Sequence, residues 1–267
     1  MKVSNILATR LARRTNNKGL TLIELLVVLV ILIALAGILI PQLPNVLQKT
    51  HASAAATNLP ELNKRMQEYS ALYSRQPAGL DNLAVSGTAL INYLPDAEAA
   101  GANAVDGQLT PGILTADEAE ALEHVGITTV MPLTALSTGL TGGLSPTINP
   151  YVAGGAVAID ATLFAAVVDQ AAVQALLLPT SVPTDRFVAY GIGAASDLTG
   201  TVLSEAPFHF SESGTENVSN TYLRYLAVYQ VQAAGTTLEH ARFVGILAAH
   251  EHGLANVASH VEEFFEN

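Results

Sequence analysis

Residues 18–41 read KGLTLIELLVVLVILIALAGILIP, and this stretch decides how the N-terminal part of the chain folds. The segment 20–40 contains 21 residues, of which only Thr21 and Glu24 have polar side chains. A helix rises about 1.5 Å per residue, so a helix of this length reaches roughly 30 Å, the thickness of the hydrocarbon core of a bilayer. The segment therefore predicts a helix that crosses a membrane once.

Glu24 is the one carboxylate inside this apolar segment. An acidic side chain at the centre of a membrane costs about 2.5–3.5 kcal/mol on insertion scales, so a carboxylate there marks a functional position with a partner. Glu24 is therefore the first candidate functional residue.

Charge divides the chain at the start of the apolar segment. Five of the 12 basic residues lie in 1–19, whereas all 23 acidic residues follow it. A basic flank holds its end of a span in the cytoplasm, which places the residues after Pro41 outside the inner membrane. The exported part is acidic and has no patch of interleaved basic and aromatic residues, so we expect no nucleic acid partner.

The basic leader, Gly19, the glutamate five residues later, the long apolar run and Pro41 together resemble the N-terminal signal of type IV pilins and type II secretion pseudopilins. In that family a membrane aspartyl peptidase, the prepilin peptidase, cuts after the glycine and methylates the new N-terminus. The resemblance implies cleavage between Gly19 and Leu20 and N-methylation of Leu20. A phenylalanine is more usual at that position. The resemblance covers residues 18 to about 83.

The same resemblance implies a role for Glu24 and a set of partners. In the family, this glutamate neutralises the N-terminal ammonium of a neighbouring subunit when the helices bundle into a filament. The implied partners are the prepilin peptidase, copies of this chain, other pilin-like subunits and an inner-membrane assembly platform. The implied location is the inner membrane, with a single span, a cytoplasmic N-terminus and a periplasmic head, and then a periplasmic or cell-surface filament. A type IV pilus and a type II secretion pseudopilus both fit the sequence.

Two other interpretations of the N-terminus explain fewer of its features. An ordinary secretory signal has an apolar core of about 7–15 residues followed directly by a small-residue cleavage site. The residues 52–54, Ala-Ser-Ala, offer such a site but lie well beyond the end of the apolar run. An uncleaved signal anchor accounts for the apolar run and its basic flank, but it does not account for the spacing of Gly19 and Glu24.

Two prolines follow the apolar segment. Pro41 cannot donate a hydrogen bond to the carbonyl of Gly37, itself a poor helix residue, and Pro44 has the same defect with respect to Ile40. Gly37, Pro41 and Pro44 therefore predict a soft hinge between the span and the head. The alternative is that Pro41 only marks the exit from the membrane.

An amphipathic helical pattern resumes beyond the prolines. Larger side chains recur on one helical face at spacings of three and four, namely Leu62, Met66, Tyr69 and Tyr73. This face is predicted to pack against a sheet. Because proline suits the first turn of a helix, Pro60 predicts a break near Asn58 rather than one continuous helix.

The predicted fold class is α+β, with a long N-terminal hydrophobic helix and a head of antiparallel sheet and flanking helices. The predicted parts are a cleaved leader (1–19), a transmembrane and polymerisation helix (20–40), a hinge with an amphipathic stalk helix (41–75) and a periplasmic or extracellular head (76–267). The chain has no cysteine, so disulfides and thiolate chemistry are excluded.

Within the head, Thr115 and Glu118 have the spacing of a capping box at the start of a helix that Gly126 ends. The remaining predictions are a helix over 161–178 capped by Asp160, strands over 127–131, 186–192, 221–232 and 241–249, a loop over 132–156, and an amphipathic helix over 253–265.

Histidines near the C-terminus offer one conceivable metal site, formed by His250, His252 and His260. Their spacing is not a recognised zinc signature, so no metal and no cofactor is predicted. The sequence also lacks a Gly-x-Ser-x-Gly nucleophile elbow and a glycine-rich phosphate loop. The preferred hypothesis is a structural filament subunit that is not an enzyme. The alternative is a membrane-tethered periplasmic enzyme or binding protein that uses these histidines as its site.

Overall fold

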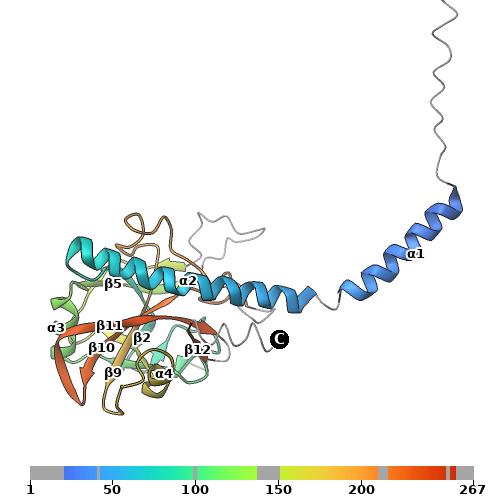
Figure 1. Cartoon of the computed structure of the whole chain (residues 1–267). Coiled ribbons are helices and arrows are strands. Elements are labelled where there is room, and N and C mark those ends of the chain that lie inside the picture. Colours follow the sequence, from blue (N-terminus) through green and yellow to red (C-terminus); the bar gives the residue numbers. More distant parts are fainter. Residues whose placement is uncertain are drawn as a thin grey trace, which may run out of the picture. The chain divides into compact units, whose positions relative to one another are not determined.

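The computed structural model describes residues 21–40, 43–98, 101–136, 151–209, 216–250 and 253–256. These residues form four helices and twelve strands, which makes the protein α+β (Figure 1). The chain divides into two compact units, Met1–Val46 and Leu47–Asn267.

Helix α1 covers Leu22–Leu39 in the first unit. Its large apolar side chains between Leu22 and Leu35 are 50–83% exposed. At about 1.5 Å per residue, its 18 residues measure roughly 27 Å. Among the described residues, none of the helices combines the length and the apolar character that crossing a bilayer requires. The predicted span over 20–40 extends beyond α1 at both ends.

The predicted hinge lies between two helical elements. Helix α1 ends at Leu39 with Gly37 in its last turn, and helix α2 covers Leu43–Tyr73 with Pro44 in its first turn. Pro41 lies outside the described residues. The hinge itself stays a prediction.

Helix α2 runs without interruption through Pro60, so the predicted break near Asn58 is wrong. A proline inside a helix costs about 3 kcal/mol. Burial of a large apolar side chain contributes about 1.5–3 kcal/mol, and four side chains on one face of α2 are almost fully buried. These are Leu59, Leu62, Met66 and Tyr69. The buried face therefore outweighs the defect, although Tyr73, which was predicted to share it, is half exposed.

The second unit is built around a ten-stranded sheet with the order β12-β11-β10-β9-β1-β5-β6, in which β8 pairs with β9 and β4, and β7 pairs with β5. Its strands are β1 (Leu80–Asn82), β4 (Leu109–Ile113), β5 (Thr129–Leu136), β6 (Tyr151–Ala153), β7 (Val157–Ala158), β8 (Phe164–Val168), β9 (Arg186–Gly191), β10 (Leu226–Ala233), β11 (Thr236–His250) and β12 (Gly253–Ala255). Strands β2 (Ala84–Ser86) and β3 (Ala89–Leu90) form a separate hairpin. The pairing is antiparallel, as predicted, except that β1 and β5 are parallel.

Helices cover both faces of this sheet, and Figure 1 shows α2 and α4 on different sides of β9, β10 and β11. On β9, Val188 and Tyr190 join one core cluster with α2 and with α3 (Ala116–His124), whereas Phe187 and Ala189 join a second cluster with α4 (Gln170–Leu176). Successive residues of a strand point to opposite faces, so this alternation produces three layers. Both clusters lie in the unit Leu47–Asn267, which therefore has its own core.

The capping box at Thr115 and Glu118 is confirmed at the start of α3. The helix over 161–178 is wrong, because residues Phe164–Val168 form β8 and α4 begins only after its N-cap, Asp169. The run 164–168 hydrogen-bonds to strands on both sides, β4 and β9, and such pairing between distant segments overrides a local helical pattern.

Other boundaries in the head also differ from the prediction. The predicted loop over 132–156 contains the end of β5 and all of β6, while residues 137–150 lie outside the described part. The predicted C-terminal helix is wrong at its start, where Gly253–Ala255 form β12, and residues 257–265 are not described. The strand predictions over 186–192, 221–232 and 241–249 correspond to β9, β10 and β11.

Candidate functional sites

Glu24 lies in the first turn of α1 and bonds to Thr21, the N-cap residue. Its Oε2 accepts hydrogen bonds from the Thr21 N–H at 2.8 Å and from the Thr21 hydroxyl at 2.9 Å. In return, the Glu24 N–H donates to Thr21 Oγ1 at 3.3 Å. This reciprocal pair is a capping box, which satisfies amides that have no partner within the helix.

The capping box gives Glu24 a partner in its own chain, and this partner was not among the sequence predictions. The signal was present, because a threonine three residues before a glutamate is the usual spacing of such a box. The negative charge of Glu24 also interacts favourably with the positive N-terminal end of the helix dipole. Gly19 and Leu20 lie outside the described residues, so cleavage and methylation there stay predictions.

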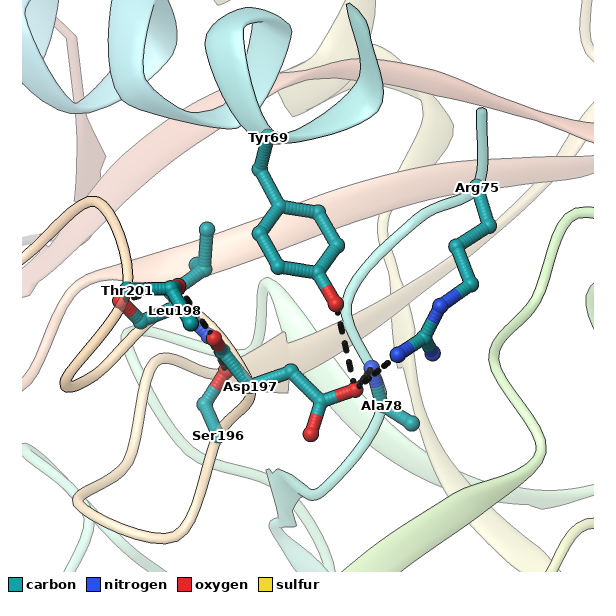
Figure 2. Close-up of polar contacts among 7 residues, drawn as sticks. All are labelled: Tyr69, Arg75, Ala78, Ser196, Asp197, Leu198 and Thr201. Carbon is teal, nitrogen blue, oxygen red and sulfur yellow. Dashed lines mark hydrogen bonds and ion pairs between the residues drawn. The ribbon is translucent and has the colours of Figure 1, made fainter. Parts of the chain in front are cut away.

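A second site, the stalk–head junction, consists of Tyr69, Arg75, Ala78 and Asp197 (Figure 2). Asp197 Oδ2 accepts from the Tyr69 hydroxyl at 3.2 Å, from Arg75 Nη2 at 2.9 Å and from the Ala78 N–H at 3.4 Å. Burial and the nearby Asp197 raise the pKa of Tyr69, which keeps its hydroxyl protonated as a donor. The junction thus joins the end of α2 to the loop that follows β9.

Backbone contacts hold the same loop in place. The Asp197 N–H donates to the Ala78 carbonyl at 3.0 Å, and the Thr201 hydroxyl donates to the Asp197 carbonyl at 2.5 Å. Gly79 has φ +68°, and a Cβ there would lie 2.6 Å from the Ala195 carbonyl oxygen, so only glycine fits. The side chains of Arg75 and Asp197 are 42% and 38% exposed, so their ion pair contributes at most about 1 kcal/mol. Its main effect is to fix geometry.

A third polar group, the buried carboxylate network, lies inside the head. Asp81 and Arg224 are only 3% and 2% exposed. Tyr222 donates to Asp81 Oδ2 at 2.8 Å, and the Arg224 guanidinium lies 4.5 Å from the centroid of the Phe208 ring. Burial raises the pKa of Asp81 to about 6, against the opposing effects of Arg224 and of the Tyr222 hydrogen bond.

This network occupies the point where β9 changes partners. Strand β9 pairs with β8 through residues 187–189 and then with β1 at the Gly191–Asp81 pair. The next residue of β1, Asn82, donates from Nδ2 to the Phe164 carbonyl at 2.8 Å. Asn82 therefore satisfies a backbone carbonyl, and Asp81 accepts from the Tyr222 hydroxyl, where two neighbouring strands diverge. Both side chains have a structural role.

Of the three candidate metal ligands, the structure describes only His250. It lies at the end of β11, is 4% exposed, and has its ring centroid 4.8 Å from that of His209. His252 and His260 lie outside the described residues. In the described ranges, no group of three or more His, Cys, Asp or Glu side chains is arranged to hold a metal ion.

Residues 14–40 match the family model described as the prokaryotic N-terminal methylation motif, which is the signal of type IV pilins and pseudopilins. The match includes Gly19, Leu20 and Glu24 and ends at Ile40, so the whole head lies outside it. No curated protein and no solved structure matches the chain.

Proposed function

We propose that this chain, which carries the pilin-type methylation signal, is a structural subunit of a type IV pilus or a type II secretion pseudopilus. The prepilin peptidase removes residues 1–19 and methylates Leu20. The mature chain then enters a filament with copies of itself or other pilin-like subunits at an inner-membrane assembly platform. The observation that carries this proposal is the match to the methylation motif over residues 14–40.

The surface of α1 supports a membrane location before assembly. Its large apolar side chains are at least half exposed between Leu22 and Leu35, and water is a poor environment for such a surface. The 18 residues of α1 fall slightly short of a bilayer core. The segment 20–40, which contains α1, has no polar side chains other than those of Thr21 and Glu24. Lipid before assembly and neighbouring helices after it are the environments that suit this surface.

The capping box supports a role for Glu24 in both environments. In a lone subunit, Thr21 supplies two donors to the carboxylate, which lowers the cost of placing it near lipid. In a filament, the methylated ammonium of a neighbour's Leu20 would add a charge-assisted hydrogen bond to the same carboxylate. Thr21 would be the second residue of the processed chain, so the box would lie beside the new N-terminus.

Processing can be tested directly on protein extracted from membranes. We expect intact-mass measurement to find a chain that begins at Leu20 and carries one N-terminal methyl group, because Gly19 follows a basic leader and precedes the apolar helix. A native chain that begins at Met1 or Ala55 would contradict the proposal.

Assembly can be tested with two variants that separate charge from capping. Glu24→Gln keeps a side chain that can complete the capping box but removes the negative charge. We expect its incorporation into filaments to fall by about tenfold or more, since a hydrogen bond to a charged group contributes about 1.5–3 kcal/mol. The measurement is the ratio of variant to wild-type subunit in sheared filaments from cells that express both.

Thr21→Val is the matched control, because it removes the hydroxyl of the cap and keeps the Glu24 charge. We expect it to enter filaments nearly as well as the wild type. If Thr21→Val loses incorporation and Glu24→Gln does not, Glu24 acts as a helix cap and not as the partner of a neighbour's ammonium.

A further inference from the structure

A pocket of about 320 Å³ lies beside the stalk–head junction, between the last turn of α2 and the loop after β9. Sites for small molecules usually measure about 300–1,000 Å³, so this pocket is at the small end of the range. It has room for one ring-sized molecule.

The lining of the pocket is polar but electrically balanced. Ser196, Thr199, Thr201 and two tyrosines of α2 line it. The Thr199 and Thr201 hydroxyls each donate to a backbone carbonyl, so they can accept a hydrogen bond from a ligand but have no proton left to donate. One cation and one anion also line it, and they pair with each other at 2.9 Å, Arg75 with Asp197. A charged ligand would find one of these two groups repulsive, so the lining favours a neutral molecule with several hydroxyl groups.

An aromatic ring forms one wall of the pocket. Tyr73 is the last residue of α2 and is half exposed, and its ring centroid lies 4.6 Å from that of Tyr69. Tyr69 is only 1% exposed and therefore restrains its neighbour. An aromatic side chain that is already restrained by a neighbour and has an accessible face can pack against the apolar C–H face of a sugar ring with little loss of conformational entropy.

The polar groups are held in place before any ligand arrives. Asp197 Oδ2 receives all three donors of the junction, and Figure 2 shows its second carboxylate oxygen directed away from them. The Thr201 hydroxyl and the Ala78 carbonyl fix the backbone of the same residue. Groups that are already ordered lose little freedom on binding, which favours recognition of a small ligand.

We propose that this pocket binds one neutral sugar ring, a hexose or an N-acetylhexosamine, through stacking on Tyr73 and hydrogen bonds to Arg75, Asp197 and the hydroxyl oxygens of Thr199 and Thr201. At about 0.3 kcal/mol per non-hydrogen atom, a ligand of this size binds with a Kd on the order of millimolar. The ligand is either a free monosaccharide or one residue of an envelope glycan. None of the residues that line this site belongs to α1, through which the chain is proposed to polymerise.

The test uses the full-length protein in a detergent without a sugar headgroup. Saturation-transfer NMR is recorded with glucose, galactose, mannose and N-acetylglucosamine in turn. We expect at least one of them to bind with a millimolar Kd, and Tyr73→Ala to weaken that binding by about tenfold or more. The matched control is Leu72→Ala, whose wild-type side chain is 65% exposed beside Tyr73 but does not line the pocket. It should bind as the wild type does.

Two further measurements make the result decisive. Thermal unfolding should show Tyr73→Ala as stable as Leu72→Ala, so that lost binding reports the pocket and not the fold. Oligosaccharides from purified cell wall should bind more tightly than the monosaccharide if a glycan is the ligand, and equally if the free sugar is. Saturation transfer to none of the four sugars or the oligosaccharides, or an equal loss in Tyr73→Ala and Leu72→Ala, would overturn the proposal.

Discussion

Replacing Glu118 by alanine is expected to destabilise the head by about 3–5 kcal/mol, because removing one partner of a buried ion pair leaves the other uncompensated. Glu118 is fully buried at the start of α3. Its Oε2 accepts from Arg186 Nη1 at 2.5 Å and from the Thr115 N–H at 2.9 Å, and its Oε1 accepts from Gln232 at 2.9 Å. One carboxylate therefore connects α3 with β9 and β10.

The measurement is urea unfolding of a fragment that begins at Leu47, which contains both core clusters. Glu123→Ala is the control, because it removes an exposed carboxylate from the same helix and should change the unfolding free energy by no more than about 0.5 kcal/mol. The Arg186 side chain is 23% exposed, so partial hydration places the expected loss toward the lower end of the range. A loss for Glu118→Ala as small as that of the control would refute the role assigned to this carboxylate.

The features that could be predicted from sequence are those whose partners lie a few residues apart. The capping box of Thr115 and Glu118 needs only a spacing of three, and it was found. Thr21 and Glu24 have the same spacing, but the resemblance to pilins implied a partner for Glu24 in a neighbouring subunit, and the partner in its own chain was not predicted. Both capping boxes follow from local spacing, but the prediction for Glu24 included only a partner in another subunit and not the capping box with Thr21.

Helix and strand boundaries failed where packing between distant segments decides the outcome. Pro60 is a sound local signal for a helix start, yet the buried face of α2 carries the helix through it. Residues 164–168 have an apolar pattern that suits a buried helix as well as a strand, and pairing with β4 and β9 selects the strand. The sequence of residues 164–168 alone does not indicate that β4 and β9 will lie on either side of them.

The polar sites of the head were missed for a related reason. Asp197 bonds to Ala78, 119 residues earlier, and Asp81 bonds to Tyr222, 141 residues later. No spacing motif relates residues so far apart. The one available signal was a pair of polar residues, Asp81 and Asn82, between apolar neighbours, and this signal does not identify a partner.

Lowering the pH from 8 to 4 is expected to stabilise the wild-type head, relative to Asp81→Asn, by about 2 kcal/mol. The pKa of Asp81 is about 6 in the folded head, above its ordinary value of 3.8, because burial penalises the charged form. A raised pKa contributes stability that is fully present below the unfolded value and is lost as the pH rises through the folded value. The contribution is therefore present near pH 4 and gone by pH 8. The asparagine variant keeps an acceptor for Tyr222 but has no proton to bind, so the difference between the two proteins isolates this group.

The tyrosines that act on Asp81 do not titrate in this window, so the step belongs to the carboxylate. They are Tyr222, Tyr93 and Tyr151, whose pKa values burial raises above the ordinary value. Asp160→Asn is the control. Hydrogen bonds from Thr162 lower the pKa of the exposed Asp160, so its contribution is lost as the pH falls and has the opposite sign. Urea unfolding of the three proteins at pH 4, 6 and 8 measures both slopes. The result would contradict this account if the difference in unfolding free energy between the wild type and Asp81→Asn does not change with pH, or if it decreases toward pH 4. Attraction to Arg224 would then outweigh burial, and Asp81 would stabilise the head in its charged form.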